Sequence, residues 1–261
     1  MTIAHTSTHS TVWRRVICAS DLTAASVQAA RQAAQLMTPD GKLILCTVLS
    51  PDAIEGGMLL DSALTRDPQA GFDLVQNELE PWHDSELHLR EGPPIRRLLE
   101  EVRAERATLV AVGSHGHGRA IGIALGSVAS AMLHEAPCPV LITPSEVPAD
   151  GDVVVGFDGS GAARRALLTG RELADRLGLR LRVIVAGGDP HPPGPGWSRE
   201  ELGAETAVTE DSRPAVEALV DGSRSARLLV VGSRHLRGVP ALASVSERVA
   251  HRASCPVLVM R

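Results

Sequence analysis

An internal repeat constrains the fold of this chain more strongly than any other feature. The segment RRVICASDLTAASVQAARQAAQLM is an apolar run, then Asp21, then an alanine-rich helical stretch, and DVVVGFDGSGAARRALLTGRELADRLG repeats that layout with Asp158 in the place of Asp21. Later, ATLVAVGSHGHG is matched by ARLLVVGSRHLRG, and HEAPCPVLI by HRASCPVLV, in the same order. This order indicates a duplication. The 261 residues suffice for two units, and we expect domains at 12–145 and 151–261, joined by the polar segment TPSEVPADG.

Strand-like and helix-like segments alternate within the first unit. Short runs of β-branched and aliphatic residues predict strands at 16–19, 42–49, 108–112 and 139–142. Helical spacing of apolar residues predicts helices at 24–37, 94–105 and 127–135. Weak periodicity at 51–71, and many Pro and Gly residues at 187–196, predict loops. Apolar strands separated by helices are typical of a parallel sheet covered on both faces, so each unit is expected to be a doubly wound α/β domain.

The composition argues against several classes of partner. The formal net charge is −5, and the chain has two Phe, three Trp and no Tyr, which disfavours a nucleic-acid surface or an anionic-membrane surface. No apolar run approaches the roughly 18 residues of a membrane helix, and the first residues lack the apolar core of a signal peptide. We therefore expect a cytoplasmic protein. The cysteines have neither CxxC nor metal-ligand spacing, so we predict buried thiols and no metal site at Cys18, Cys46, Cys138 and Cys255.

The glycine-rich segment after the third predicted strand points to a ligand. Asp21 and Gly113 each follow a strand, so both are expected on the rim where open α/β sheets bind ligands. Glycines at 113, 116 and 118 can take a positive φ and let the main chain approach a ligand closely. Gly126 and Ser127 then open a helix, whose unpaired N–H groups suit phosphate.

Better-known motifs do not fit this segment. A P-loop requires Lys after its last glycine, and no Lys follows any of these glycines. A dinucleotide fingerprint fails because the third glycine position after Gly116 is Ile121. A GxSxG nucleophile elbow is absent around Ser114 and Ser160. No catalytic residue is therefore assigned.

The spacing Gly113-x-x-Gly116, nine residues, then Gly126-Ser127 resembles the ATP-binding pattern of the universal stress protein family. The strand–Asp start and the closing Ala-Pro-Cys-Pro-Val-Leu are also similar, and the resemblance covers nearly the whole chain as a tandem pair. It implies two five-stranded, parallel, Rossmann-like domains of the adenine nucleotide alpha-hydrolase-like kind. It also implies that the closing strands, at 139–142 and 256–260, pack together as an internal pseudo-dimer.

The resemblance also implies a site, position by position. Asp21 would lie near the ribose and phosphates, and the main chain of Val48 would meet the adenine edge. ATP or another adenine nucleotide would be bound, with Mg²⁺ bridging its phosphates through phosphate oxygens and water. His115, His117 and Arg119 could add positive charge. The implied binding residues are Ala19, Asp21, Val48, Val112, Gly113, Gly116, Gly126, Ser127 and Val128.

The second unit departs from this pattern. Gly232 is kept, but His235 stands at the second glycine and Val245-Ser246 at the Gly-Ser pair. A Cβ at those places would intrude where the main chain should meet phosphate. We expect the second unit to be a structural partner.

The leading interpretation is a stress-response protein whose first domain binds ATP as a sensor or regulatory switch, with at most slow hydrolysis. The alternatives are a true ATPase using the same pocket and a nucleotide-free interaction scaffold with regulatory protein partners. ADP, AMP or cyclic AMP would fit an adenine site as well, and a homodimer stays open. Asp21 and Asp158 have a second interpretation as helix caps, and His115 with His117 as solvated loop residues.

Overall fold

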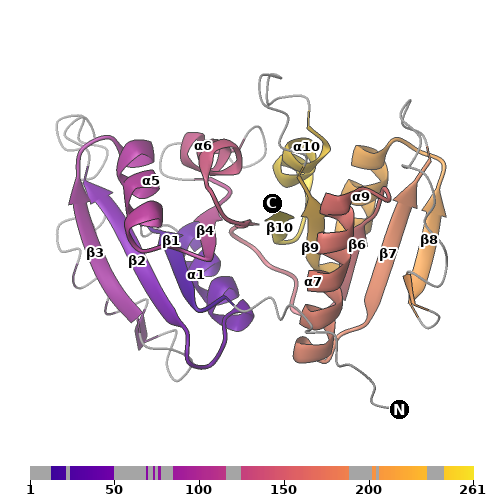
Figure 1. Ribbon diagram of the computed structural model, residues 1–261, viewed down its shortest axis with the longest axis horizontal. Helices are drawn as coiled ribbons and strands as arrows, with labels where there is room; N and C mark the ends of the chain where they lie inside the picture. The colour runs from indigo at the N-terminus through magenta and orange to yellow at the C-terminus, as the bar shows by residue number, and fades with distance from the viewer. Residues whose placement is uncertain are drawn as a thin grey trace, which may run out of the picture.

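The computed structural model describes residues 13–21, 24–49, 69, 73, 76–77, 85–115, 125–187, 202–203, 206–233 and 244–261. Its strands form one sheet in the order β3-β2-β1-β4-β5-β10-β9-β6-β7-β8 (Figure 1). In the first half the strands are β1 (Arg15–Ala19), β2 (Lys42–Leu49), β3 (Ser85–Glu91), β4 (Leu109–Gly113) and β5 (Val140–Thr143). In the second half they are β6 (Asp152–Gly156), β7 (Leu181–Ala186), β8 (Ala207–Asp211), β9 (Ala226–Gly232) and β10 (Val257–Met260).

The strands pair in parallel within each half, and the halves join through β5 and β10. These two strands pair in antiparallel fashion, with Leu141 opposite Leu258. The doubly wound α/β prediction is confirmed, and so is the prediction that the closing strands join the halves. The duplication thus yields one continuous sheet.

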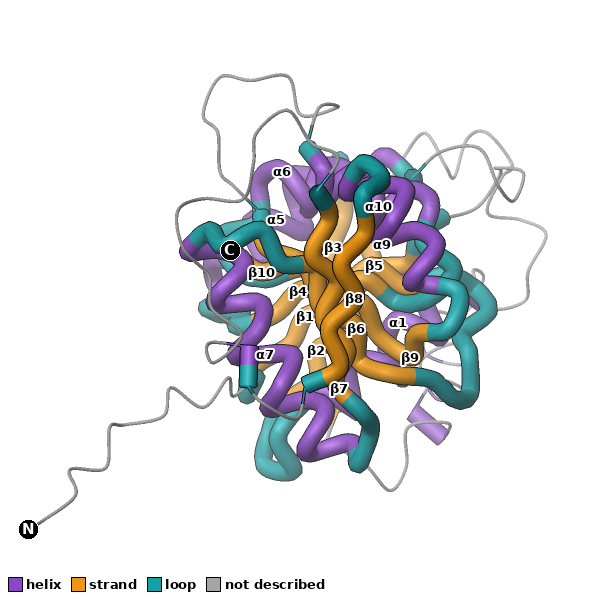
Figure 2. Tube along the Cα trace, turned by 90° about the vertical axis from the view of Figure 1, so that its right-hand side faces the viewer, coloured by secondary structure: helices purple, strands orange, loops and turns teal. Residues whose placement is uncertain are grey.

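Helices cover both faces of this sheet. One face carries α1 (Ala24–Leu36) and α7 (Gly161–Leu177), and the other carries α5 (Pro94–Ala104), α6 (Ser127–Glu135), α9 (Ala215–Ser223) and α10 (Val245–Arg252). Figure 2 shows the strands between these helical layers. Each of the two hydrophobic cores runs through both halves, because side chains of β5 and β10 contribute to both. No helix in the described part of the chain is long and apolar enough to cross a bilayer.

Local sequence explains where several helices begin and end. Pro94 opens α5, where the missing N–H of proline costs nothing. Ser160 caps α7 by accepting a hydrogen bond from the N–H of Ala163, and Gly178 ends α7 in the left-handed conformation. By contrast, α6 has Gly126 at its N-cap and no side-chain cap.

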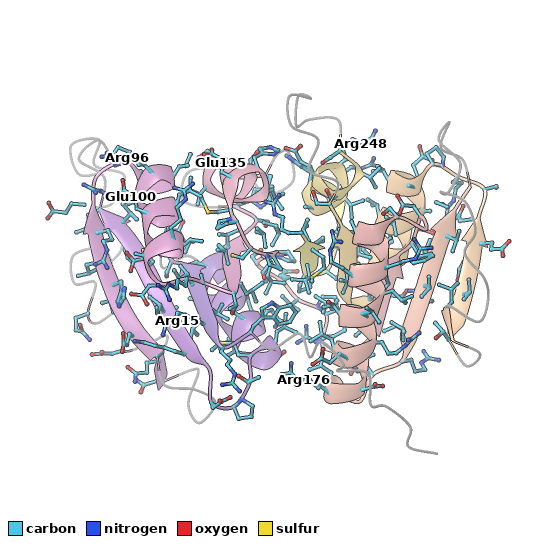
Figure 3. The ribbon with its side chains drawn as sticks, in the orientation of Figure 1. Arg15, Arg96, Glu100, Glu135, Arg176 and Arg248 are labelled. Carbon is cyan, nitrogen blue, oxygen red and sulfur yellow. The ribbon has the colours of Figure 1, made fainter. Side chains whose placement is uncertain are left out.

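Three arginines of the second half bind the first half. Arg176 of α7 donates to the carbonyl oxygens of Leu36 and Met37 at the end of α1, at 3.1 and 2.6 Å. Figure 3 shows Arg176 at the end of α7 that lies nearest to α1. Arg227 donates to the amide oxygens of Gln32 and Gln35. Arg261 donates to the carbonyl oxygens of Met132 and Leu133 in α6.

The predicted elements of the first half match the structure within one residue at each end. The sequence pattern missed β3, because its residues alternate charged and apolar at the sheet edge and only Ser85 among them is buried. The predicted loops at 51–71 and 187–196 lie outside the described residues, except at positions 69 and 187.

Candidate nucleotide-binding site

A cavity of about 270 Å³ opens at the carboxyl ends of β1, β2 and β4. It lies where the strand order reverses between β1 and β4, the usual ligand position in such sheets. Every residue of the predicted site lines it except Gly116, which lies outside the described residues. The lining also contains His115, named above as a possible source of positive charge, and the residues that were not predicted are Ser20, Ser26, Cys46, Pro94, Leu98 and Ala129.

One side of the cavity is apolar. Cys46 and Val48 of β2 line it together with Pro94 and Leu98 of α5. Burial and the neighbouring carboxylate of Glu101 raise the pKa of the Cys46 thiol to about 12, although Arg90 acts in the opposite direction. The thiol therefore stays neutral at physiological pH and contributes an apolar surface, as predicted for all four buried cysteines.

The other side of the cavity is the N-terminus of α6. The first three helical residues, Ser127, Val128 and Ala129, all line the cavity, and their N–H groups have no partner within the helix. No side chain caps this end. Unpaired N–H groups together with the helix dipole make this end suited to an anion.

Gly113 lines the cavity and also has a packing role that was not predicted. It lies in extended β4, paired with Thr143, and is absent from the described glycines of positive φ. A Cβ at Gly113 would lie 2.9 Å from main-chain and side-chain carbons of Ala25 in α1. The missing side chain therefore allows α1 to pack against the end of β4, and Gly113 does not use the positive φ that glycine permits.

The same packing explains why Gly232 is kept in the second half. A Cβ there would lie 2.5 Å from the carbonyl carbon of Ala162, at the equivalent place in α7. The presence of Gly232 is therefore not evidence of a nucleotide site in the second half, because the close packing of α7 requires a glycine there whether or not a ligand is bound.

Gly126 also differs from its predicted role. Its N–H donates to the carbonyl oxygen of Ser114 at 2.8 Å, so this group is already used. Its φ of −61° is open to any residue. The amides available to an anion are thus those of Ser127, Val128 and Ala129, and Gly126 matters because it brings no side chain to the rim.

Asp21 is the one charged side chain among the described residues that line the cavity. His115 also lines it, and its Nδ1 lies 2.8 Å from the hydroxyl of Ser114. His117 and Arg119 lie outside the described residues.

In the corresponding region of the second half, serine side chains of that half cap the N-termini of the helices. Asp158 accepts a hydrogen bond from the N–H of Ser160, so Ser160 rather than Asp158 caps α7. At α10, the hydroxyl of Ser244 accepts from the N–H of Glu247, whose acidic side chain lies in the first turn. Leu219 of α9 corresponds to Leu98 of α5, because each lies five residues after a proline, Pro214 or Pro93. A Cβ on Gly156, at the end of β6, would lie 3.0 Å from the Leu219 side chain, so Leu219 packs closely against that strand end.

The predicted match of Val245-Ser246 to Gly126-Ser127 is wrong by two residues. Counted back from the shared Cys-Pro pairs at Cys138 and Cys255, Ser244 corresponds to Ser127, because the sequence from Gly232 to Ser244 is two residues shorter than that from Gly113 to Ser127. The C-terminal ends of the helices agree with this count, since the C-caps Ala136 of α6 and Ala253 of α10 each lie two residues before these cysteines.

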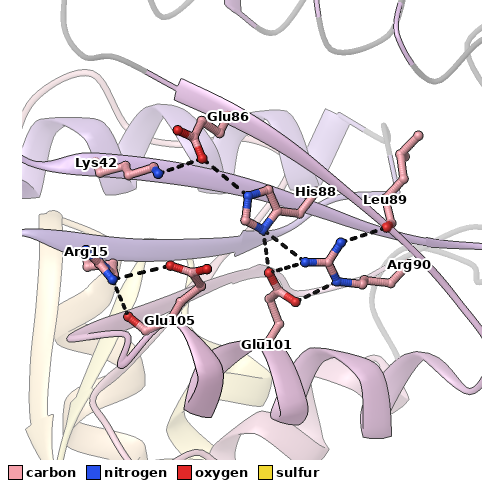
Figure 4. A network of polar contacts seen from close by, with 8 residues as sticks. All are labelled: Arg15, Lys42, Glu86, His88, Leu89, Arg90, Glu101 and Glu105. Atoms are coloured by element: carbon pink, nitrogen blue, oxygen red, sulfur yellow. Dashed lines mark hydrogen bonds and ion pairs between the residues drawn. The ribbon is translucent and has the colours of Figure 1, made fainter.

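A polar network beside the cavity was not predicted (Figure 4). Glu101 is only 5% exposed and accepts two hydrogen bonds from Arg90, at 2.7 and 2.8 Å, and its other close partner is His88. His88 lies opposite Cys46 in the β2–β3 pairing, and Glu101 lies one turn after Leu98. The network fixes α5 over the apolar side of the cavity. The missed β3 supplies two of its members, so the sequence offered no signal for it.

Burial opposes the charge on Glu101, but hydrogen bonds from Arg90 and His88 outweigh it and hold the pKa of Glu101 below its ordinary value. His88, Glu101 and Glu105 are also close enough together to share a metal ion. Because the Arg90 guanidinium already contacts both oxygens of Glu101, we interpret the cluster as an ion-pair network.

The family model of the universal stress protein family matches residues 13–144 and 197–261. A universal stress protein of Mycolicibacterium smegmatis is 30% identical over 203 residues, which is 67% of this chain and 68% of the relative. A universal stress protein of Mycobacterium tuberculosis is 35% identical over 184 residues, 59% of this chain and 62% of the relative, so the chain spans less than two thirds of its length. The crystal structure of a universal stress protein from Archaeoglobus fulgidus superposes with a TM-score of 0.73 at 20% identity, over 95% of this chain and 98% of that one, which shows the shared fold. The match of the family model over most of the sequence establishes that this chain belongs to the universal stress protein family.

Proposed function

We propose that the first domain, residues 12–145, binds ATP or a related adenine nucleotide as a regulatory ligand. In this proposal the second domain, residues 151–261, is its structural partner. The observation that carries the proposal is the uncapped N-terminus of α6, which opens onto a cavity whose opposite side is apolar. A nucleotide has the same two ends, a flat base of low polarity and an anionic phosphate chain.

The ligand would lie across the ends of the strands. The base would contact Val48 and Leu98, next to the neutral thiol of Cys46. The ribose would pass Val112 and the carboxylate of Asp21, which can accept hydrogen bonds from its hydroxyls. The phosphates would meet the first turn of α6. The cavity volume is close to the lower end of small-molecule sites, roughly 300 to 1,000 Å³, and suits a nucleoside with its first phosphate.

We propose a sensor rather than a hydrolase because of the charges around the cavity. Its described lining contains no Lys or Arg to stabilise the charge that develops on a transferring phosphoryl group. Asp21 is its one carboxylate, so Mg²⁺ would be held mainly by phosphate oxygens and water, as is usual for this ion. Cytoplasmic ATP would be the natural ligand.

Replacing Ser127 tests the proposal. Ser127→Asp places a negative charge at the first turn of α6, which stabilises the helix by a few tenths of a kcal/mol but repels phosphate. Ser127→Asn is the neutral control of the same shape. We expect Ser127→Asp to weaken ATP binding about tenfold or more in calorimetry, and Ser127→Asn to change it by about threefold at most.

Four ligands make the test specific. ATP, AMP and cyclic AMP should each lose affinity in Ser127→Asp, whereas adenosine, which has no phosphate, should keep its affinity. Equal losses for adenosine would contradict the placement of the phosphates, and no heat with any of the four would contradict nucleotide binding. Phosphate release at a useful rate, measured with and without Mg²⁺, would favour the ATPase alternative instead.

A further inference from the structure

A side chain of the second half binds the main chain just before the N-terminus of α6. His251 of α10 accepts a hydrogen bond at Nδ1 from the N–H of Leu125, at 2.9 Å. Leu125 is buried and directly precedes Gly126, which is bound to Ser114 within the first half. Segments 126 residues apart in sequence therefore meet at the rim of the cavity. In Figure 3, the labels of Glu135 and Arg248 mark the two helices concerned, α6 and α10.

This hydrogen bond fixes the tautomer of His251. An imidazole nitrogen that accepts from an N–H carries no proton, so the proton of a neutral His251 must be on Nε2. Nε2 lies 3.9 Å from a carboxylate oxygen of Glu247. A nearby carboxylate favours the proton on the nitrogen that faces it, as in carboxylate–histidine pairs in general. Glu247, His251 and Leu125 thus form a chain from the second half to the first.

Glu247 is buried in a way that packing alone does not explain. Its side chain is 3% exposed, and its Oε2 has no hydrogen-bond partner among the described residues. Its Oε1 lies 3.2 Å from Nε2 of His134, on α6, and 3.5 Å from the hydroxyl of Ser130. A buried carboxylate with spare acceptor capacity beside two imidazoles gains interactions when either imidazole is protonated.

We propose that His251 is a positioning residue for the nucleotide site and that its protonation loosens that site. The proposal rests on the proposed function of the first domain. Neutral His251 holds Leu125, and thereby keeps Gly126 and the first turn of α6 in the arrangement that receives phosphate. Protonation adds a second hydrogen to the imidazole ring, and this hydrogen is on Nδ1. Nδ1 then cannot accept a hydrogen bond from the N–H of Leu125. The imidazolium ion pairs more strongly with Glu247 instead.

The charged groups around the imidazole support this interpretation. On its own helix they are Glu247 and the exposed Arg248 and Arg252, and on α6 the facing group is His134. Arg261, at the end of β10, donates to carbonyl oxygens of α6 rather than to Glu247. The interaction that His251 gains on protonation therefore comes from Glu247.

Two substitutions of similar size separate positioning from packing. In His251→Asn the amide oxygen takes the place of Nδ1 and can still accept from Leu125, without titrating. In His251→Gln the amide group takes the place of Nε2 instead, so the acceptor for Leu125 is lost. In calorimetry with ATP near neutral pH, we expect His251→Gln to weaken binding about threefold to tenfold, the value of one hydrogen bond, and His251→Asn to bind like the wild type.

The pH profile is the second readout. Over a pH series from about 8 down to about 5, ATP affinity of the wild type should fall relative to that of His251→Asn, because protonated His251 cannot accept from Leu125. Because ATP itself titrates in this range, the ratio of the two proteins at each pH is the quantity compared. A constant ratio, or equal affinities of the Asn and Gln variants, would overturn the proposal.

A measurement without ligand separates this inference from the proposed function. Amide hydrogen exchange at Leu125 in the free protein should be faster in His251→Gln than in the wild type and in His251→Asn. If exchange follows this order but no nucleotide binds any of the proteins, the positioning contact stands and the proposed function fails. If exchange is the same in all three, the positioning contact is wrong even when ATP binds.

Discussion

At the scale of single residues, the buried carboxylate of Glu101 shows how the first half stabilises the apolar side of its cavity. Arg90 and His88 reach it from β3, and they lower its pKa despite burial. A group with a lowered pKa in the folded state stabilises the protein above its ordinary pKa, here 4.5, and loses that contribution as the pH falls through the folded value. Glu101 is therefore expected to contribute at neutral pH.

Glu101→Gln should lower the free energy of unfolding at pH 7 by about 2 kcal/mol, because Arg90 loses its charged partner. Below pH 4.5 the difference from the wild type should shrink, because the unfolded state takes up a proton on Glu101 that the folded state takes up only at lower pH. Urea unfolding over a series of pH values measures this. Glu100→Gln is the control, because Glu100 forms exposed ion pairs with Arg96 and Arg97, and it should change stability little. A difference that grows toward acid pH would contradict the role of Glu101.

At the scale of elements, the position of each first helix depends on a glycine at the end of a neighbouring strand. Because Gly113 and Gly232 have no side chain, α1 packs closely against Gly113 and α7 against Gly232, in each case through the second and third residues of the helix. The two halves share this packing although only the first opens a helix N-terminus onto the described cavity. The packing that the two halves share at these glycines is therefore a feature of the fold and is not evidence of a ligand.

Gly113→Ala and Gly232→Ala should each destabilise the protein by about 1 to 3 kcal/mol, because the added carbon overlaps helix backbone that cannot move freely. Gly161→Ala is the matched control. The nearest atom to a Cβ there is in the Arg165 side chain at 3.8 Å, so this substitution should be neutral or slightly stabilising. Chemical denaturation measures all three. If Gly113→Ala lost nucleotide binding at full stability, Gly113 would be a ligand residue after all.

At the scale of the whole molecule, the second half completes the first. Pairing of β5 with β10 makes the two cores continuous. The last turn of α1 has no basic residue of its own, and Arg176 of α7 supplies the positive charge to its final carbonyl groups. These contacts predict that neither half reaches full stability alone.

Arg176→Ala should lower the free energy of unfolding by about 1 to 2 kcal/mol, because the end of α1 loses charge-assisted hydrogen bonds. Arg180→Ala is the control, because the Arg180 side chain is 89% exposed in its ion pair with Asp152 and should contribute about 0.5 kcal/mol or less. Differential scanning calorimetry compares the two variants. Equal effects would mean that the contact between the halves adds nothing beyond an exposed ion pair.

The sequence by itself determined the duplication, the strands and helices of the first half apart from β3, and, through the resemblance to the universal stress protein family, part of the cavity lining. The strands and helices follow from local patterns, since burial on a strand or helix face imposes a period, and a strand end followed by a helix start indicates a position on the rim. Only the tertiary structure decided what Gly113 and Gly126 do, where the edge strand β3 lies, and that His251 holds Leu125. These depend on contacts between residues far apart in the chain, and such contacts leave no periodic mark on either partner.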